Sequence, residues 1–217
     1  MEFIPHISSL IYSSWTGWLM LGLLLCAILA EVAQPGVLSG AAISLFARSN
    51  RTYHAAPNNV VGQLLIFTFR IGTMTMALCM CFYTTGHFAF MTYLKVCGVV
   101  LSMLVFKMIA NTLVDYAFSI SRLYGEAHEH YANLLTLAMI VLYPCLLVLI
   151  RWYNVNVNRW VVGMICIVFC LAWLIRCFRT YATSVASVVY ILIHYITVEI
   201  LPMTGMVYVT AQKIFTI

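Results

Sequence analysis

The sequence predicts an all-α fold, a polytopic transmembrane helix bundle of about six spans in one integral membrane domain, residues 1–217. Of the 217 residues, 64% are hydrophobic and 8% are charged, and the mean hydropathy is +1.01. An ordinary soluble domain has about 25% charged residues. Several apolar runs also reach the ~20 residues that a helix needs to cross a bilayer. These runs are continuous rather than alternating, which favours helices over barrel strands.

The first predicted span covers residues 10–30 and is closed by Glu31, Gln34 and Pro35. The preceding stretch has no Lys/Arg-rich region and no A-x-A cleavage site follows the first apolar run, so we expect this span to be retained. The next apolar segment, residues 36–46, is too short to cross a bilayer. We expect it to be re-entrant or to lie along the interface.

Five further spans are predicted at residues 60–83, 88–112, 133–150, 160–178 and 186–210. The second follows a Pro57-Asn58-Asn59 turn, and the fourth contains Pro144. Arginines at the segment ends are typical of headgroup anchors. The sequence has no basic stripe of the kind that would indicate nucleic-acid binding. The eight cysteines lie in or beside apolar runs without a C-x-x-C pair, which favours buried apolar packing over disulfides.

The last span carries an acidic residue, Glu199, near its middle and Pro202 one turn later. A carboxylate at the bilayer centre costs roughly 2.5–3.5 kcal/mol on insertion scales, so a partner is expected. Arg70, near the middle of the second span, is the first-ranked partner, and Lys107 is the second. Such a pair would either specify helix packing or form an ion or proton relay, and both interpretations remain open.

Other polar residues extend this predicted cluster. Lys107, Asn111 and Asp115 recur at i, i+4 and i+8, which places them on one helical face. Tyr195 lies one turn before Glu199. The predicted intramembrane charge cluster therefore comprises Arg70, Lys107, Asn111, Asp115, Tyr195, Glu199 and Pro202, and no catalytic residue is predicted.

A metal site and a haem site are weaker hypotheses. The connection between the third and fourth spans contains Glu126, His128, Glu129 and His130. If this connection is helical, its first and last members share a face, and such ligands suit zinc or iron. The alternative is a solvated loop or helix start. His194 lies inside the last span and invites haem b, but the other histidines lie in turns and connections, so no cofactor is predicted.

The string ITVEILP at residues 196–202 resembles a C-terminal signature, Leu-Tyr-Leu-Cys-Thr-Leu-Glu-Ile-Leu-Pro, of an uncharacterised multi-pass inner-membrane family of the Bacteroidetes. The matching positions are Thr197, Glu199, Ile200, Leu201 and Pro202, and the departures are His194, Ile196 and Val198. The resemblance covers about ten residues. It implies an inner-membrane location and the importance of the Glu-to-Pro segment, and it implies no reaction.

These features together favour a non-enzymatic subunit or accessory factor of a larger envelope complex, such as a secretion, insertion or motor assembly. No phosphate-binding or nucleophile-elbow motif occurs. One alternative is a small proton- or ion-coupled transporter component that uses Glu199, Arg70 and Lys107. Another is a haem- or quinone-linked redox subunit. The expected partners are the lipid bilayer and other membrane subunits, with no nucleic acid, in a bacterial inner membrane.

Overall fold

A computed structural model describes residues 14–38, 40, 59–82, 89–118, 121–151, 154–181, 188, 192 and 195–214. Throughout this part of the chain the regular structure is helical. The long helices are α2 (Ser14–Ala33), α4 (Val60–Phe82), α5 (Phe90–Phe118), α6 (Ser121–Arg151) and α7 (Val155–Tyr181). The C-terminal segment consists of π-helix η1 (Tyr195–Ile200), α9 (Leu201–Val209) and π-helix η2 (Thr210–Ile214), in direct succession.

Five helices are long and apolar enough to cross a membrane. They are Trp15–Ala33, Val60–Phe82, Phe90–Ala110, Tyr131–Arg151 and Asn156–Phe178. The chain is therefore a multi-pass helical membrane protein, as predicted. The predicted sixth span, 186–210, begins in residues outside the described part, and a count of six stays a prediction. Most of the predicted re-entrant or interfacial segment, 36–46, also lies outside the described residues.

Three helices are longer than the apolar runs from which they were predicted. One is α7, which covers Val155–Tyr181 rather than residues 160–178, and the other two are α5 and α6. α5 continues past residue 112 to Phe118, and α6 begins at Ser121 rather than at residue 133. The hydropathy pattern marks only the part of a helix that lies in hydrocarbon, so it misses polar turns that continue beyond the bilayer. The polar connection between these spans is accordingly helical over much of its length.

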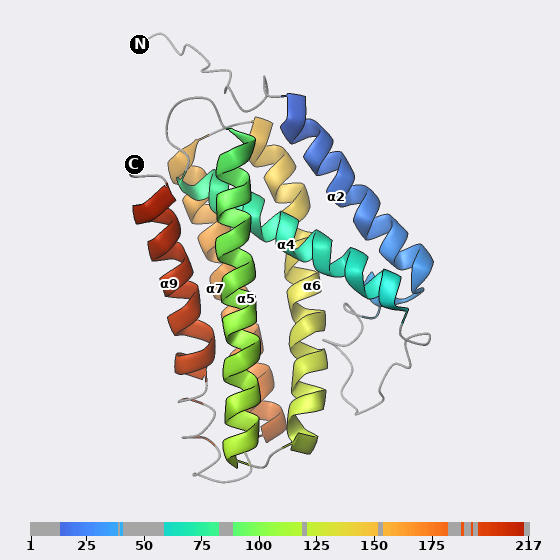
Figure 1. Ribbon diagram of the computed structural model, residues 1–217, viewed down its shortest axis with the longest axis vertical. Helices are drawn as coiled ribbons and strands as arrows, with labels where there is room; N and C mark the ends of the chain where they lie inside the picture. Colours follow the sequence, from blue (N-terminus) through green and yellow to red (C-terminus); the bar gives the residue numbers. More distant parts are fainter. Residues whose placement is uncertain are drawn as a thin grey trace.

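Helix α4 is the centre of the bundle, because it packs against α2, α5, α6 and α7. Figure 1 shows α4 crossing obliquely behind α5, with α2 alongside it. Two glycines permit the close approach of α2. A Cβ atom at Gly72 would overlap Leu23 Cδ2, and one at Gly62 would lie 2.9 Å from Gln34 Cβ. Small residues of this kind are what allow membrane helices to pack closely without a hydrophobic driving force.

The first turn of α7 caps the end of α4. Asn158 Nδ2 donates to the Met80 carbonyl at 3.3 Å, and Arg159 Nε donates to the Cys81 carbonyl at 2.8 Å. The last carbonyls of a helix have no intrahelical donor. The two side chains therefore satisfy backbone groups of α4 and also fix α7 beside it.

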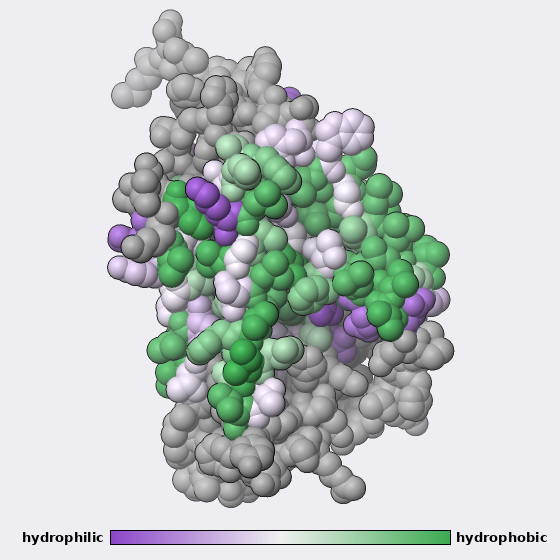
Figure 2. Space-filling view, viewed as in Figure 1, coloured by the Kyte–Doolittle hydropathy of each residue, from purple (hydrophilic) through white to green (hydrophobic). Residues whose placement is uncertain are grey.

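Apolar side chains cover most of the coloured surface in Figure 2. Individual examples are highly exposed, including Trp18 at 71%, Leu64 at 63% and Met108 at 64%. Large contiguous apolar patches are rare on soluble monomers. This surface therefore faces lipid or other membrane proteins.

We predict that Gly72→Val lowers the thermal unfolding temperature of the detergent-purified protein by several degrees, because the added methyl groups would overlap buried Leu23. Overpacking of this kind costs roughly 1–3 kcal/mol. Gly98→Val in α5 is the matched control, since nothing lies within 4 Å of a Cβ atom built there. Leu23→Ala should partly rescue Gly72→Val. Equal effects of the two glycine substitutions would contradict the close α2–α4 contact.

Candidate functional site

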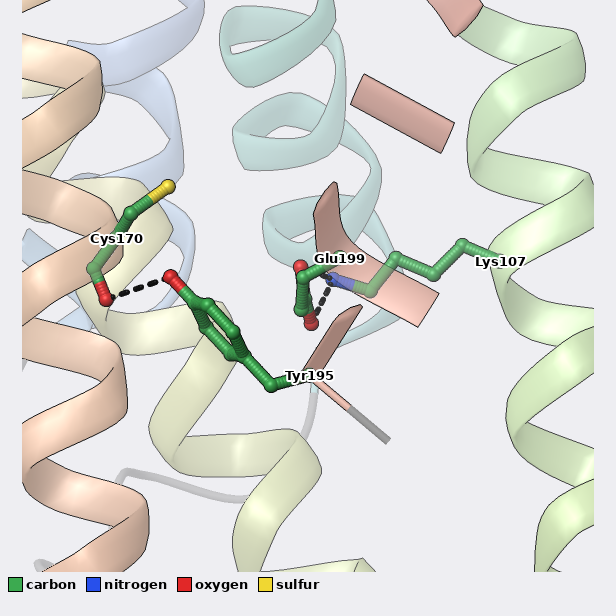
Figure 3. A network of polar contacts seen from close by, with 4 residues as sticks. All are labelled: Lys107, Cys170, Tyr195 and Glu199. Atoms are coloured by element: carbon green, nitrogen blue, oxygen red, sulfur yellow. Dashed lines mark hydrogen bonds and ion pairs between the residues drawn. The ribbon is translucent and has the colours of Figure 1, made fainter. Parts of the chain in front are cut away.

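The buried ion pair between Lys107 and Glu199 is the centre of the candidate site. Lys107 Nζ lies 2.6 Å from both carboxylate oxygens of Glu199. The two residues are 6% and 4% exposed, respectively. Figure 3 shows the lysine reaching from α5 to the carboxylate on η1. The carboxylate in the last apolar run is therefore compensated by a cation from a helix far away in the sequence.

The ammonium group of Lys107 also lies over an aromatic ring. Its Nζ is 3.2 Å from the centroid of the Tyr131 ring, at the start of the α6 span. That ring makes edge contacts with Trp173 and Phe169 of α7, at centroid distances of 5.2 and 5.7 Å. A cation over an aromatic face gains about 2 kcal/mol or more when it is desolvated. The cation is thus stabilised by α6 and α7 as well as by its carboxylate partner.

Tyr195 fixes the same turn of the C-terminal segment to α7. Its hydroxyl group donates to the carbonyl oxygen of Cys170 at 2.9 Å, and the side chain is 7% exposed. In Figure 3, Tyr195 and Glu199 leave η1 towards different neighbours, Cys170 and Lys107. The single turn between them is therefore held from two sides.

The π-helical geometry of η1 is explained by Pro202, which lies at the start of α9. In a regular α-helix, residue 202 would donate its N–H to the carbonyl of Val198, but proline has no N–H and its ring would clash with that carbonyl. A π-turn is one of the local adjustments by which membrane helices accommodate proline. Such turns occur frequently at functional sites. Here Pro202 determines the form of the turn that carries Glu199.

Arg70 makes different contacts from those predicted. Its Nε donates to Thr136 Oγ1 at 2.9 Å, its Nη2 donates to the same oxygen, and this hydroxyl group donates onward to the Ala132 carbonyl. The ranking of Arg70 before Lys107 as the partner of Glu199 was therefore wrong. Thr136 lies little more than one turn after Tyr131 on α6. Arg70 thus lies in the same region of the bundle without belonging to the ion pair.

Several predicted site residues have side chains outside the described part of the structure. Asn111 and Asp115 lie on the α5 backbone, one and two turns beyond Lys107. Glu126, His128, Glu129 and His130 lie on the α6 backbone, and the helix places the first and last one turn apart. His194 is outside the described residues. Among the side chains that are described, no group of three or more His, Cys, Asp or Glu residues could hold a metal ion. The metal and haem hypotheses remain predictions.

Sequence reasoning missed three participants: Tyr131, Thr136 and Cys170. Tyr131 stands where a polar connection meets an apolar run, a position that is ordinary for an interfacial aromatic residue. Thr136 is fully buried, and its hydroxyl group accepts from Arg70 and donates to a backbone carbonyl of its own helix. Cys170 takes part through its backbone carbonyl, which no side-chain pattern could reveal.

We predict strong energetic coupling between the two members of the ion pair. Lys107→Met or Glu199→Gln alone should each destabilise the protein by about 3–5 kcal/mol, because removing one partner leaves the other group buried without compensation. The double variant should be less destabilised than the sum of the singles. Thermal unfolding in detergent measures the stability of each variant. The control is a second double-mutant cycle in which Arg70→Met takes the place of Lys107→Met. Additivity within about 0.5 kcal/mol in the Lys107 cycle would contradict direct pairing.

Comparison with known proteins yields a family match that covers most of the chain. Residues 16–209 match the model of a family described as a domain of unknown function, DUF4271. None of the curated proteins and none of the solved structures matches the chain. The matched range includes Arg70, Lys107, Tyr131 and Glu199. The Bacteroidetes origin and the C-terminal signature remain expectations from the resemblance. The chain belongs to the DUF4271 family of uncharacterised proteins.

Proposed function

We propose that the protein is a non-enzymatic subunit or accessory factor of a larger envelope complex in a bacterial inner membrane, such as a secretion, insertion or motor assembly. The observation that carries this proposal is that the buried ionisable groups bond to one another inside the bundle. Both oxygens of Glu199 accept from Lys107, and the same ammonium lies over Tyr131. Groups bonded to one another in this way hold helices together rather than present a reactive centre.

The polar contacts define which helices are neighbours. The ion pair joins α5 to η1, Tyr195 joins η1 to α7, and Arg70 joins α4 to α6. An alternative packing would leave a charge or a polar group in hydrocarbon without its partner, which is unfavourable. The bundle therefore has a strongly specified geometry, as a scaffold for other subunits requires.

Helix α2 offers a surface for such a subunit. It lies at one side of the bundle and packs mainly against α4 (Figure 1). Its remaining side chains form an exposed apolar strip that includes Leu25, Ile28, Leu29 and Val32, each at least 49% exposed. Since α2 has few neighbours among the described helices, a helix of another subunit could pack against this strip.

We predict that the tagged full-length protein, extracted from native membranes in mild detergent, is recovered with partner proteins in fixed stoichiometry. Ile28→Trp should reduce that recovery, because it alters the strip on α2. Ile109→Trp in α5 is the matched control, since the two isoleucines are 50% and 51% exposed. Quantitative mass spectrometry of the eluates gives the readout. Recovery of the protein alone, or equal loss in both variants, would argue against the proposal.

A second candidate, a proton- or ion-coupled transporter component, is favoured by the position of Glu199 on a π-turn inside an apolar segment. Ionisable residues in membranes often mark ion and proton pathways. In proteoliposomes, transport through this site would appear as a proton-dependent flux that Glu199→Gln abolishes. Glu31→Gln is the control, because Glu31 caps backbone N–H groups of Gly36 and Leu38 after α2. An absence of flux in the wild-type protein would exclude this candidate.

A further inference from the structure

The outer face of α7 contains a groove of about 410 Å³. It is lined by Asn156, Arg159, Trp160, Gly163, Met164 and Ile167. Gly163 is what opens it, because no atom lies within 4 Å of a Cβ atom built there. The groove starts in the first turns of the α7 span, and at 1.5 Å per residue Ile167 lies roughly 12 Å deeper than Arg159. Its polar end is thus at the membrane boundary and its apolar end is in hydrocarbon.

The polar end of the groove has an oriented cation. Arg159 is exposed, and its Nε donates to the Cys81 carbonyl at the end of α4, which fixes the plane of the guanidinium group. A guanidinium carries five N–H donors in a fixed fork, so the others remain for an acceptor outside the protein. Asn156 is also exposed and adds an amide. Trp160, 75% exposed, is suited to the headgroup level.

The surrounding charges favour an anion. The other basic residues with described side chains at this end of the bundle are Lys95, near the start of α5, and Arg151, at the end of α6, and both are exposed. The acidic residues of the described helices lie elsewhere: Glu31 at the far end of α2, Asp115 near the end of α5, Glu126 and Glu129 near the start of α6, and Glu199 in the interior. Within the described part of the chain, the ammonium group of a zwitterionic lipid would therefore have no carboxylate to meet at this end of the bundle.

We propose that this groove binds an anionic phospholipid. The phosphate group is bound by Arg159 and Asn156, and an acyl chain lies along Gly163, Met164 and Ile167. Arginine suits this role because its planar donors match phosphate oxygens in pairs. Basic pockets beside membrane helices bind anionic headgroups in the same way. The site is independent of the proposed subunit role, because the groove includes no residue of α2 or of the ion pair.

The test uses the purified full-length protein in detergent, with thermal unfolding as the readout. Phosphatidylglycerol should raise the unfolding temperature by several degrees, whereas phosphatidylethanolamine with the same acyl chains should give less than half of that shift. Inorganic phosphate should give no shift, because it lacks the chain that fills the apolar part of the groove. Equal shifts with the two lipids, or a full shift with phosphate alone, would overturn the proposal.

Two variants and two matched controls place the effect at the groove. Arg159→Gln and Gly163→Leu should remove most of the phosphatidylglycerol shift. Arg151→Gln and Gly98→Leu should keep it, since neither residue lines the groove and a Cβ atom at Gly98 likewise meets nothing within 4 Å. Because Arg159→Gln also loses the contact with α4, Gly163→Leu is the deciding variant.

Native mass spectrometry of the same samples identifies the occupant of the groove. It should detect bound phosphatidylglycerol on the wild-type protein and much less on Gly163→Leu. A full shift in Gly163→Leu, a loss in Arg151→Gln as large as in Arg159→Gln, or a protein chain in place of lipid would overturn the proposal.

Discussion

A carboxylate in the middle of an apolar helix needs a cation, and the packing of the other helices meets that requirement by placing Lys107 beside Glu199. Glu199 is 4% exposed, and its partner Lys107 comes from α5, which is separated from it by α6 and α7 in the sequence. The pair restricts how the C-terminal segment can lie against the bundle, since a shift of one turn would separate the charges. Tyr131 contacts the same ammonium, so α6 is bound by the same constraint.

The remaining architecture is built around α4, which packs against α2 and against α5, α6 and α7, the three helices that contact the ion-pair region. Gly72 allows α2 to approach it, Arg70 joins it to α6, and α7 caps its last carbonyls through Asn158 and Arg159. These contacts are mostly hydrogen bonds and close backbone packing. That is expected in lipid, where apolar side chains gain little by leaving one hydrocarbon environment for another.

Sequence pattern predicted the helical membrane class, the first five spans and the need for a partner at Glu199. Apolar length and the cost of a charge in hydrocarbon are local properties, so they can be read without a structure. The identity of the partner could not be predicted, because Arg70 and Lys107 both lie well within apolar runs and depth does not determine which helices are adjacent. The contacts made by the Cys170 carbonyl and by the face of the Tyr131 ring likewise depend on which helices pack together, so the sequence could not reveal them.

The central claim is that Lys107 and Glu199 are in direct contact within the membrane. Solid-state NMR on lipid-reconstituted protein tests it directly, by dipolar dephasing between ¹⁵N at lysine Nζ and ¹³C at glutamate Cδ. We predict dephasing of the strength expected for an ion-pair contact, which disappears in Lys107→Met and remains in Lys95→Met. An absence of dephasing, or dephasing that persists in Lys107→Met, would contradict the claim.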